Sequence, residues 1–82
     1  DAQYNLGNCY YNGEGVEKNL VKAVEYYQLA ANQGDAIAQS NLGYCYYNGV
    51  GVDKNEILSI YWYLKAIENG ESKYSMNNLK LI

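Results

Sequence analysis

The sequence has no histidine, no arginine and no threonine among its 82 residues. Without histidine, the Ser-His and Cys-His pairs of nucleophilic catalysis cannot form. Its cations are six lysines, outnumbered by nine acidic residues, and the net charge of −3 argues against a nucleic-acid partner, because phosphates need clustered cations. No apolar run approaches the roughly 20 residues of a membrane-spanning helix, which argues against a membrane partner.

The remaining polar residues do not form a catalytic or metal-binding pattern. No serine precedes a lysine at the S-x-x-K spacing, and Glu25, Glu56 and Glu68 fall on predicted exposed helix faces. Two cysteines without histidine make a poor metal site. We therefore predict that the chain is not an enzyme and has no cofactor.

The two cysteines, Cys9 and Cys45, occupy equivalent positions 36 residues apart. Equivalent positions on stacked helices lie about one helix spacing apart, roughly 8–10 Å, which exceeds comfortable disulfide reach. We therefore favour two free thiols over a disulfide, and free thiols favour a reducing compartment such as the cytoplasm.

One phrase is written twice, as YYNGEGVEKN at residues 10–19 and YYNGVGVDKN at residues 46–55. When residues 2–34 are aligned with 38–70, about half of the positions are identical. Self-similarity at a period of 20–50 residues is typical of a solenoid. We predict repeat units at 1–34 and 35–70, with 71–82 as the first helix of a third repeat or a terminal cap.

Units one and two are each predicted to fold as two helices, and 71–82 adds one more. The five helices would form an all-α solenoid of antiparallel pairs, wound as a right-handed superhelix. In the first helix of unit two, the apolar face is Ala38, Leu42, Cys45 and Tyr46. In the second helix it is Ser59, Trp62, Tyr63, Ala66 and Ile67. Gly43, in the middle of a helix, indicates that a neighbouring helix passes close to the backbone.

The repeated phrase is interpreted as the loop between the two helices of a unit. The positions are Gly13 and Gly49 at the helix ends, Gly15 and Gly51 in a tight turn, Val16 and Val52 as apolar anchors between the helices, and Asn19 and Asn55 as N-caps. Gly34 and Gly70 follow the second helices, and Asp35 starts the next helix. A phosphate-binding loop is disfavoured, because the phrase lacks the third glycine and follows a helix rather than a strand.

These residues resemble the Sel-one-like repeat family, a tetratricopeptide-like class with the pattern LGxxYxxGxGV. Unit two carries this pattern as Leu42, Gly43, Tyr46, Gly49, Gly51 and Val52, and unit one as Leu6, Gly7, Tyr10, Gly13, Gly15 and Val16. The resemblance implies a protein–protein interaction scaffold or adaptor, often within a larger signalling protein.

A strip of polar and aromatic residues beside the predicted core face of the first helices is a candidate partner-binding surface for a protein or peptide. Its members are Tyr4, Asn8, Tyr11, Asn12, Ile37, Ser40, Tyr44, Tyr47, Asn48, Tyr74 and Asn77. Tyrosine and asparagine combine rigid contact area with adaptable hydrogen bonding. The alternative is that Tyr11 and Tyr47 pack against the next repeat, and the sequence does not separate the two.

A structural spacer, or a segment that associates end to end with itself, is the other hypothesis. Solenoids with few repeats leave apolar end faces uncovered. Leu79, Leu81 and Ile82 are expected to be exposed unless another copy or more chain covers them.

Overall fold

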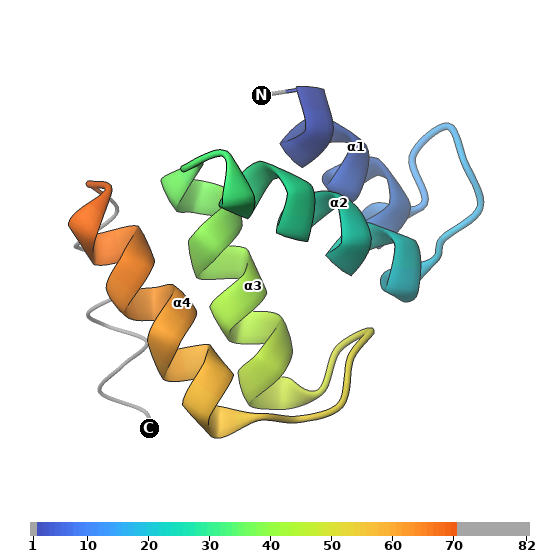
Figure 1. The fold of residues 1–82 in the computed structure, drawn as a ribbon. Helices are drawn as coiled ribbons and strands as arrows, with labels where there is room; N and C mark the ends of the chain where they lie inside the picture. The colour runs from blue at the N-terminus through green and yellow to red at the C-terminus, as the bar shows by residue number, and fades with distance from the viewer. Residues whose placement is uncertain (1, 71–82) are drawn as a thin grey trace.

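A computed structural model describes residues 2–70 of the chain and shows two helix pairs (Figure 1). The helices are α1 (Ala2–Asn12), α2 (Leu20–Asn32), α3 (Ala36–Asn48) and α4 (Glu56–Glu68). Residues 2–70 contain no strand, and none of their helices has the length and hydrophobicity needed to cross a bilayer. The all-α repeat architecture agrees with the prediction, whereas the expected fifth helix, over 71–82, lies outside the described residues.

The helices begin and end where the sequence signals predict. The side chains of Asn19, Asp35 and Asn55 each accept a hydrogen bond at 3.0 Å from the backbone N–H three residues later. Each bond satisfies one of the N–H groups that a helix start leaves unpaired. At the other end of α3, Gly49 is a left-handed C-cap with φ of 69°, a conformation that glycine adopts without steric cost.

Within each pair, a tyrosine ring of the second helix lies on a glycine of the first. A Cβ added at Gly7 would meet the ring of Tyr27 at 2.8 Å, and one added at Gly43 would meet the ring of Tyr63 at 3.0 Å. The Ser59 hydroxyl also donates a 2.8 Å hydrogen bond to the carbonyl of Gly43. These contacts confirm the close helix approach predicted from the mid-helix glycine.

The two pairs share one core, formed between α2 and α3. Its buried members are Ala23, Val24, Tyr27, Ala30, Ala31, Ala38, Leu42 and Cys45. Across this joint, Gln39 Nε2 donates to the Ala31 carbonyl at 2.9 Å, and Gln39 Oε1 accepts from Asn69 at 3.0 Å. The buried amide thus connects the end of the first pair to the end of the second.

The predicted valine anchors differ between the two loops. Val52 packs against the shared core, and its loop contacts the backbone of Leu20 and the side chain of Val24. Val16, in contrast, is 38% exposed. The expectation that both valines fill a space inside their own helix pair is therefore wrong, because Val52 joins one repeat to the α2 helix of the repeat before it.

Substituting Gly51 with alanine should destabilise the protein more than substituting Gly15. Both glycines have φ near +70°, so each alanine carries backbone strain of about 1–2 kcal/mol. Only at Gly51 would the new Cβ also collide with the Leu20 carbonyl, since no atom lies within 4 Å of a Cβ at Gly15. Urea unfolding followed by circular dichroism should show an additional loss of about 1–3 kcal/mol for Gly51→Ala. Equal losses would contradict the packing of this loop on α2.

Candidate functional site

A groove about 420 Å³ in volume lies between the first helices of the two pairs. Its lining residues, which define the α1–α3 groove, are Asn8, Tyr11, Asn12, Tyr27, Asn41, Tyr44 and Cys45. None of them carries a formal charge at neutral pH, and every one except Cys45 offers an amide or a phenol. The groove is therefore suited to hydrogen bonding and aromatic contact rather than to ion pairing.

The centre of this groove is Tyr27, which comes from α2 rather than from a first helix. Its side chain is only 2% exposed, yet its hydroxyl donates a 2.5 Å hydrogen bond to Asn8 Oδ1. Asn41, which also lines the groove, has an Nδ2 that donates to the Tyr4 hydroxyl at 3.3 Å. Tyr27 therefore connects α2 to α1, and the bond from Asn41 to Tyr4 connects α3 to α1.

Burial, reinforced by the neighbouring Tyr4 phenol, raises the pKa of Tyr27 well above its usual range. The Asn41 hydrogen bond opposes this by lowering the pKa, which is the effect of a donor that stabilises the phenolate. The Tyr27 hydroxyl therefore stays neutral at physiological pH and donates its proton to Asn8 Oδ1.

Tyrosine rings support the hydrogen-bonded centre from two sides. The ring of Tyr4 lies 5.7 Å from that of Tyr27 and the ring of Tyr11 lies 6.4 Å from it, both in tilted arrangements. Such aromatic pairs contribute about 0.5–1.5 kcal/mol beyond area burial. Tyr11 is half-buried, packs against the core and also lines the groove, so its packing role is observed and its binding role stays a prediction.

The structure brings part of the predicted strip together. Four of its members line the groove, namely Asn8, Tyr11, Asn12 and Tyr44. Of these, Tyr44 is 39% exposed. Tyr4 reaches it through Asn41. Outside the lining on α3 lie Ile37, Tyr47 and Asn48. Tyr74 and Asn77 fall outside the described residues, and the binding role of the strip stays a prediction.

Ser40 is the member of the strip that the structure corrects, because it is 1% exposed and cannot present itself to a partner. The error arises from treating α3 as a helix with one buried face. α3 packs against α2 on one side and α4 on the other, so its buried arc is wide and includes Ser40.

Sequence reasoning did not place Tyr27 and Asn41 in the candidate site. Tyr27 matches Tyr63 in the repeat alignment, and that position is read as core. The ring does belong to the core, but a phenol extends far enough for its hydroxyl to emerge between α1 and α3. The hydroxyl of Tyr27, on the otherwise apolar stripe of α2, was the signal that could have indicated this, because a buried phenol requires a hydrogen-bond partner.

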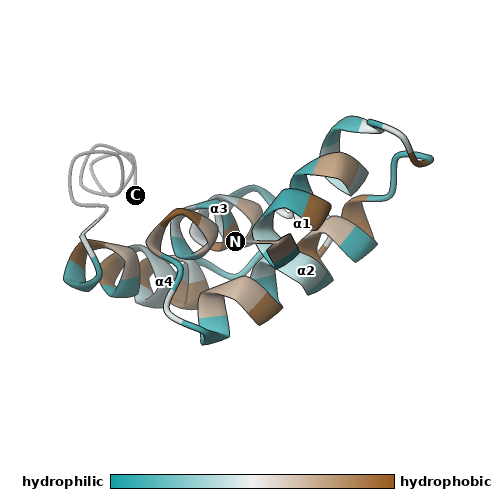
Figure 2. Cartoon of the chain, turned by 90° about the horizontal axis from the view of Figure 1, so that it is seen from above, coloured by the Kyte–Doolittle hydropathy of each residue, from teal (hydrophilic) through white to brown (hydrophobic). Residues whose placement is uncertain are grey.

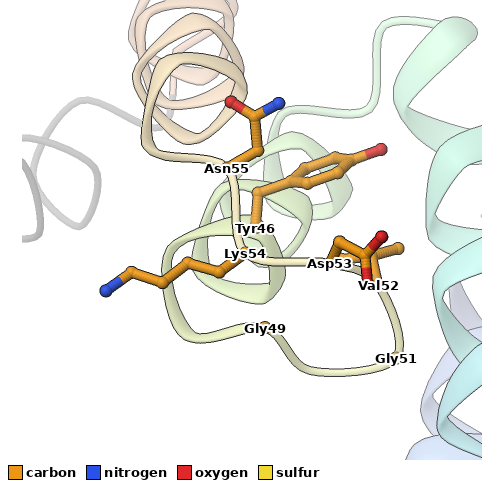
Figure 3. Close-up of a pocket in the computed structure, with 7 residues that line it drawn as sticks. All are labelled: Tyr46, Gly49, Gly51, Val52, Asp53, Lys54 and Asn55. Atoms are coloured by element: carbon orange, nitrogen blue, oxygen red, sulfur yellow. The ribbon is translucent and has the colours of Figure 1, made fainter.

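The loop of the second repeat forms another hollow, about 700 Å³ and widely open (Figure 3). Asp53 and Lys54 point to opposite sides of it. The Lys54 amine lies 3.5 Å from Glu56 and 5.8 Å from the ring centre of Tyr47. The equivalent loop of the first repeat encloses a similar hollow. The hollow is a consequence of the loop geometry, since it occurs in both repeats, and Lys54 already contacts Glu56 and Tyr47. We therefore assign the hollow no binding role.

Both cysteines are free thiols, with Cys9 half-buried and Cys45 buried. Burial raises the pKa of the Cys45 thiol to about 11. Residues 2–70 hold no group of three or more His, Cys, Asp or Glu side chains that could bind a metal ion.

Helix pairs that stack through repeated contacts define the chain as an α-solenoid repeat protein. The Sel1 repeat family matches residues 1–35 and 36–71, so the chain belongs to the Sel1 repeat family. A comparison with curated proteins gave no match.

Three solved structures share the fold over nearly the whole chain. A Sel1 repeat protein from Oxalobacter formigenes is 45% identical over 93% of this chain and 31% of its own, with a TM-score of 0.87. The protective antigen c5321 from uropathogenic Escherichia coli is described as displaying an SLR fold. It is 38% identical over 95% of this chain and 16% of its own, with a TM-score of 0.90. Helicobacter pylori cysteine rich protein B is 37% identical over 92% of this chain and 56% of its own, with a TM-score of 0.86. The chain thus spans little more than half, or less, of each of these proteins.

Replacing Tyr27 with phenylalanine should lower the free energy of unfolding by about 1–3 kcal/mol, because it leaves the half-buried Asn8 Oδ1 without its donor. Tyr26→Phe is the matched control, since the Tyr26 hydroxyl forms no hydrogen bond in the described part of the chain. Urea unfolding should show little change for the control. Equal effects of the two substitutions would contradict the hydrogen-bond network.

The buried thiol should make the protein less stable at alkaline pH. The pKa of Cys45 is higher in the folded state, about 11 against 9.0, so its contribution is complete below pH 9 and is lost as the pH rises toward 11. The loss should reach about 2–3 kcal/mol. Unfolding experiments at pH 8 and pH 11 should show a smaller pH effect in Cys45→Ala than in the parent protein. The same pH effect in both would contradict the assignment.

Proposed function

We propose that this chain is a protein-interaction scaffold whose α1–α3 groove binds an extended peptide segment of a partner protein. The observation that carries the proposal is the uncharged lining of tyrosine and asparagine in a groove of about 420 Å³. Tyrosine supplies rigid contact area at low entropic cost, and asparagine supplies adaptable hydrogen bonds.

The fold and family support this role. Sel1 repeat proteins are generally helical scaffolds for protein interaction, and a solenoid presents its first helices along a continuous surface. The groove walls are two helices held by a shared core. A surface on packed helices changes little on binding, which reduces the entropy that association must overcome.

Substitution of Tyr44 with serine should weaken peptide binding at least about tenfold, because truncating a central interface tyrosine commonly costs 1–2 kcal/mol or more. Peptides selected from a random display library on the parent protein would serve as ligands, with affinity measured by fluorescence polarisation. Tyr61→Ser removes a similarly exposed tyrosine from α4, away from the groove, and should leave affinity unchanged. A library that yields no binder, or equal losses for both variants, would contradict the proposal.

Self-association is a second candidate, supported by the outer face of α4. Hydrophobic residues run along this helix (Figure 2), and Ile57 is 81% exposed. Ile60 is also exposed, although its repeat equivalent, Val24, is buried beside Gly51 and Val52 of the next loop. The corresponding loop of a second copy could cover Ile60 in the same way.

Sedimentation velocity tests this second candidate. Association through α4 should give a sedimentation coefficient that rises with concentration in the parent protein. Ile60→Glu should abolish the rise, while Leu29→Glu on the exposed side of α2 should retain it. A monomer at every concentration would exclude end-to-end association of this chain.

A further inference from the structure

A second groove lies on the side of α2 that faces away from the α1–α3 groove. It is about 510 Å³ in volume, and its other wall is the loop after α3, which reaches the backbone of Leu20 at Gly51 (Figure 1). We call it the α2–loop groove; it is lined on α2 by Val21, Val24, Glu25, Gln28 and Leu29, and on the loop by Val52. Glu25 and Leu29 each lie two positions from Tyr27, which places them about 160° from it around the helix. The two grooves share no lining residue.

Apolar side chains dominate the α2–loop groove, and two of them are exposed. Val21 is 57% exposed and Leu29 is 46% exposed. Val24 and Val52 form the apolar floor, and both pack in the core that the two repeats share. Apolar groups that gather around a concavity, rather than being scattered singly, are typical of contact sites. The groove therefore offers a contact surface beyond what the repeat packing uses.

Glu25 is the only residue of this lining with a formal charge. Its carboxylate is exposed and forms no ion pair within residues 2–70. The lysine one turn before it, Lys22, lies over the ring of Tyr10 instead. The exposed wall of α2 thus presents an acidic group between two aliphatic side chains. A partner of complementary charge carries a cation between two apolar side chains.

The spacing of this wall matches a second helix. Val21, Glu25 and Leu29 follow one another at intervals of four residues and form one row, with about 6 Å of helix rise between neighbours. Side chains three or four residues apart on another helix have nearly the same spacing, so the two rows can interdigitate. An extended peptide fits less well, because its main-chain groups need partners and Gln28 Nε2 already donates to Asn32 Oδ1. A helix satisfies its own main chain.

We propose that the α2–loop groove binds an amphipathic helix of a partner protein, with a Lys or Arg side chain on Glu25 and an aliphatic side chain on either side of it. One aliphatic side chain packs on Val21 and the other on Leu29. This contact is separate from the peptide site proposed for the α1–α3 groove. Because Val52 belongs to the repeat after α2, the binding surface exists only where two repeats stack.

A library of helices displayed on a stable helical carrier protein tests the proposal, with the full-length chain as the target. The carrier is needed because short isolated helices are marginal in water. Selected helices should place Lys or Arg one turn from an aliphatic residue on each side. Their affinity, measured by fluorescence polarisation, should fall at least about tenfold for Leu29→Asn and for Glu25→Lys. Leu64→Asn and Glu14→Lys make the same changes at exposed positions outside the groove and should leave affinity unchanged.

A charge reversal tests the ion pair itself. A selected helix whose Lys or Arg is replaced by Glu should bind the parent protein about tenfold more weakly and should regain affinity for the Glu25→Lys variant. A variant that had merely lost its fold would bind neither helix, and circular dichroism should show the parent helix content. Failure of the reversed helix to regain affinity would overturn the pairing with Glu25.

The outcomes separate this inference from the proposed function. Tyr44→Ser should leave helix binding unchanged, because Tyr44 lines only the α1–α3 groove. Loss of binding in Tyr44→Ser but not in Leu29→Asn would place the helix in the α1–α3 groove and overturn the inference. A library without a binder would also overturn it, and the proposed peptide site would stand. Self-association of the parent protein that Glu25→Lys abolishes would assign the α2–loop groove to a second copy instead.

Discussion

The contact between a helix glycine and a tyrosine ring is the constraint on which the rest of the structure depends. At Gly7 and Gly43, a side chain as small as a methyl group would strike the ring of Tyr27 or Tyr63. Glycine in a helix costs about 1 kcal/mol relative to alanine, and here the close helix approach offsets that cost. Because the ring lies on the backbone of α1, the Tyr27 hydroxyl emerges beside Asn8. The packing that builds the helix pair thereby places a polar atom in the groove.

The joint between the repeats depends on a second close approach. Gly51 places its loop on the backbone at the start of α2, and Val52 joins the core that α2 and α3 share. In unit one, Gly15 has the same backbone conformation with open space around it. Two loops that differ at only two of ten positions therefore have different energetic roles, because within residues 2–70 only the second one packs on a preceding helix. Stability in such an array arises between neighbouring units as well as within each.

The sequence predicted those features that follow from local rules. The 36-residue repeat indicated helix pairs, and Asn19, Asn55 and Gly49 marked helix ends, because capping depends on neighbouring backbone groups. The sequence did not predict the features that depend on tertiary packing. Ser40 is buried because α3 has neighbours on two sides, and Val16 is exposed because no helix within residues 2–70 covers its loop. Asn41 joined the candidate site only when the reach of the Tyr27 hydroxyl was known, which repeat alignment does not reveal.

The residues that line the α1–α3 groove contribute to stability, and in the proposed function they also contact the partner. Tyr27 contributes its ring to the core and its hydroxyl to the orientation of Asn8. A half-buried amide with an unused donor or acceptor stabilises the free protein less than a fully bonded one would. Replacing Asn41 with an apolar residue would remove the hydrogen bond that joins α3 to the Tyr4 hydroxyl of α1, and with it an amide that lines the groove. The polar lining at the joint between repeats therefore holds the two repeats together in the free protein, and in the proposed function the same residues contact the peptide.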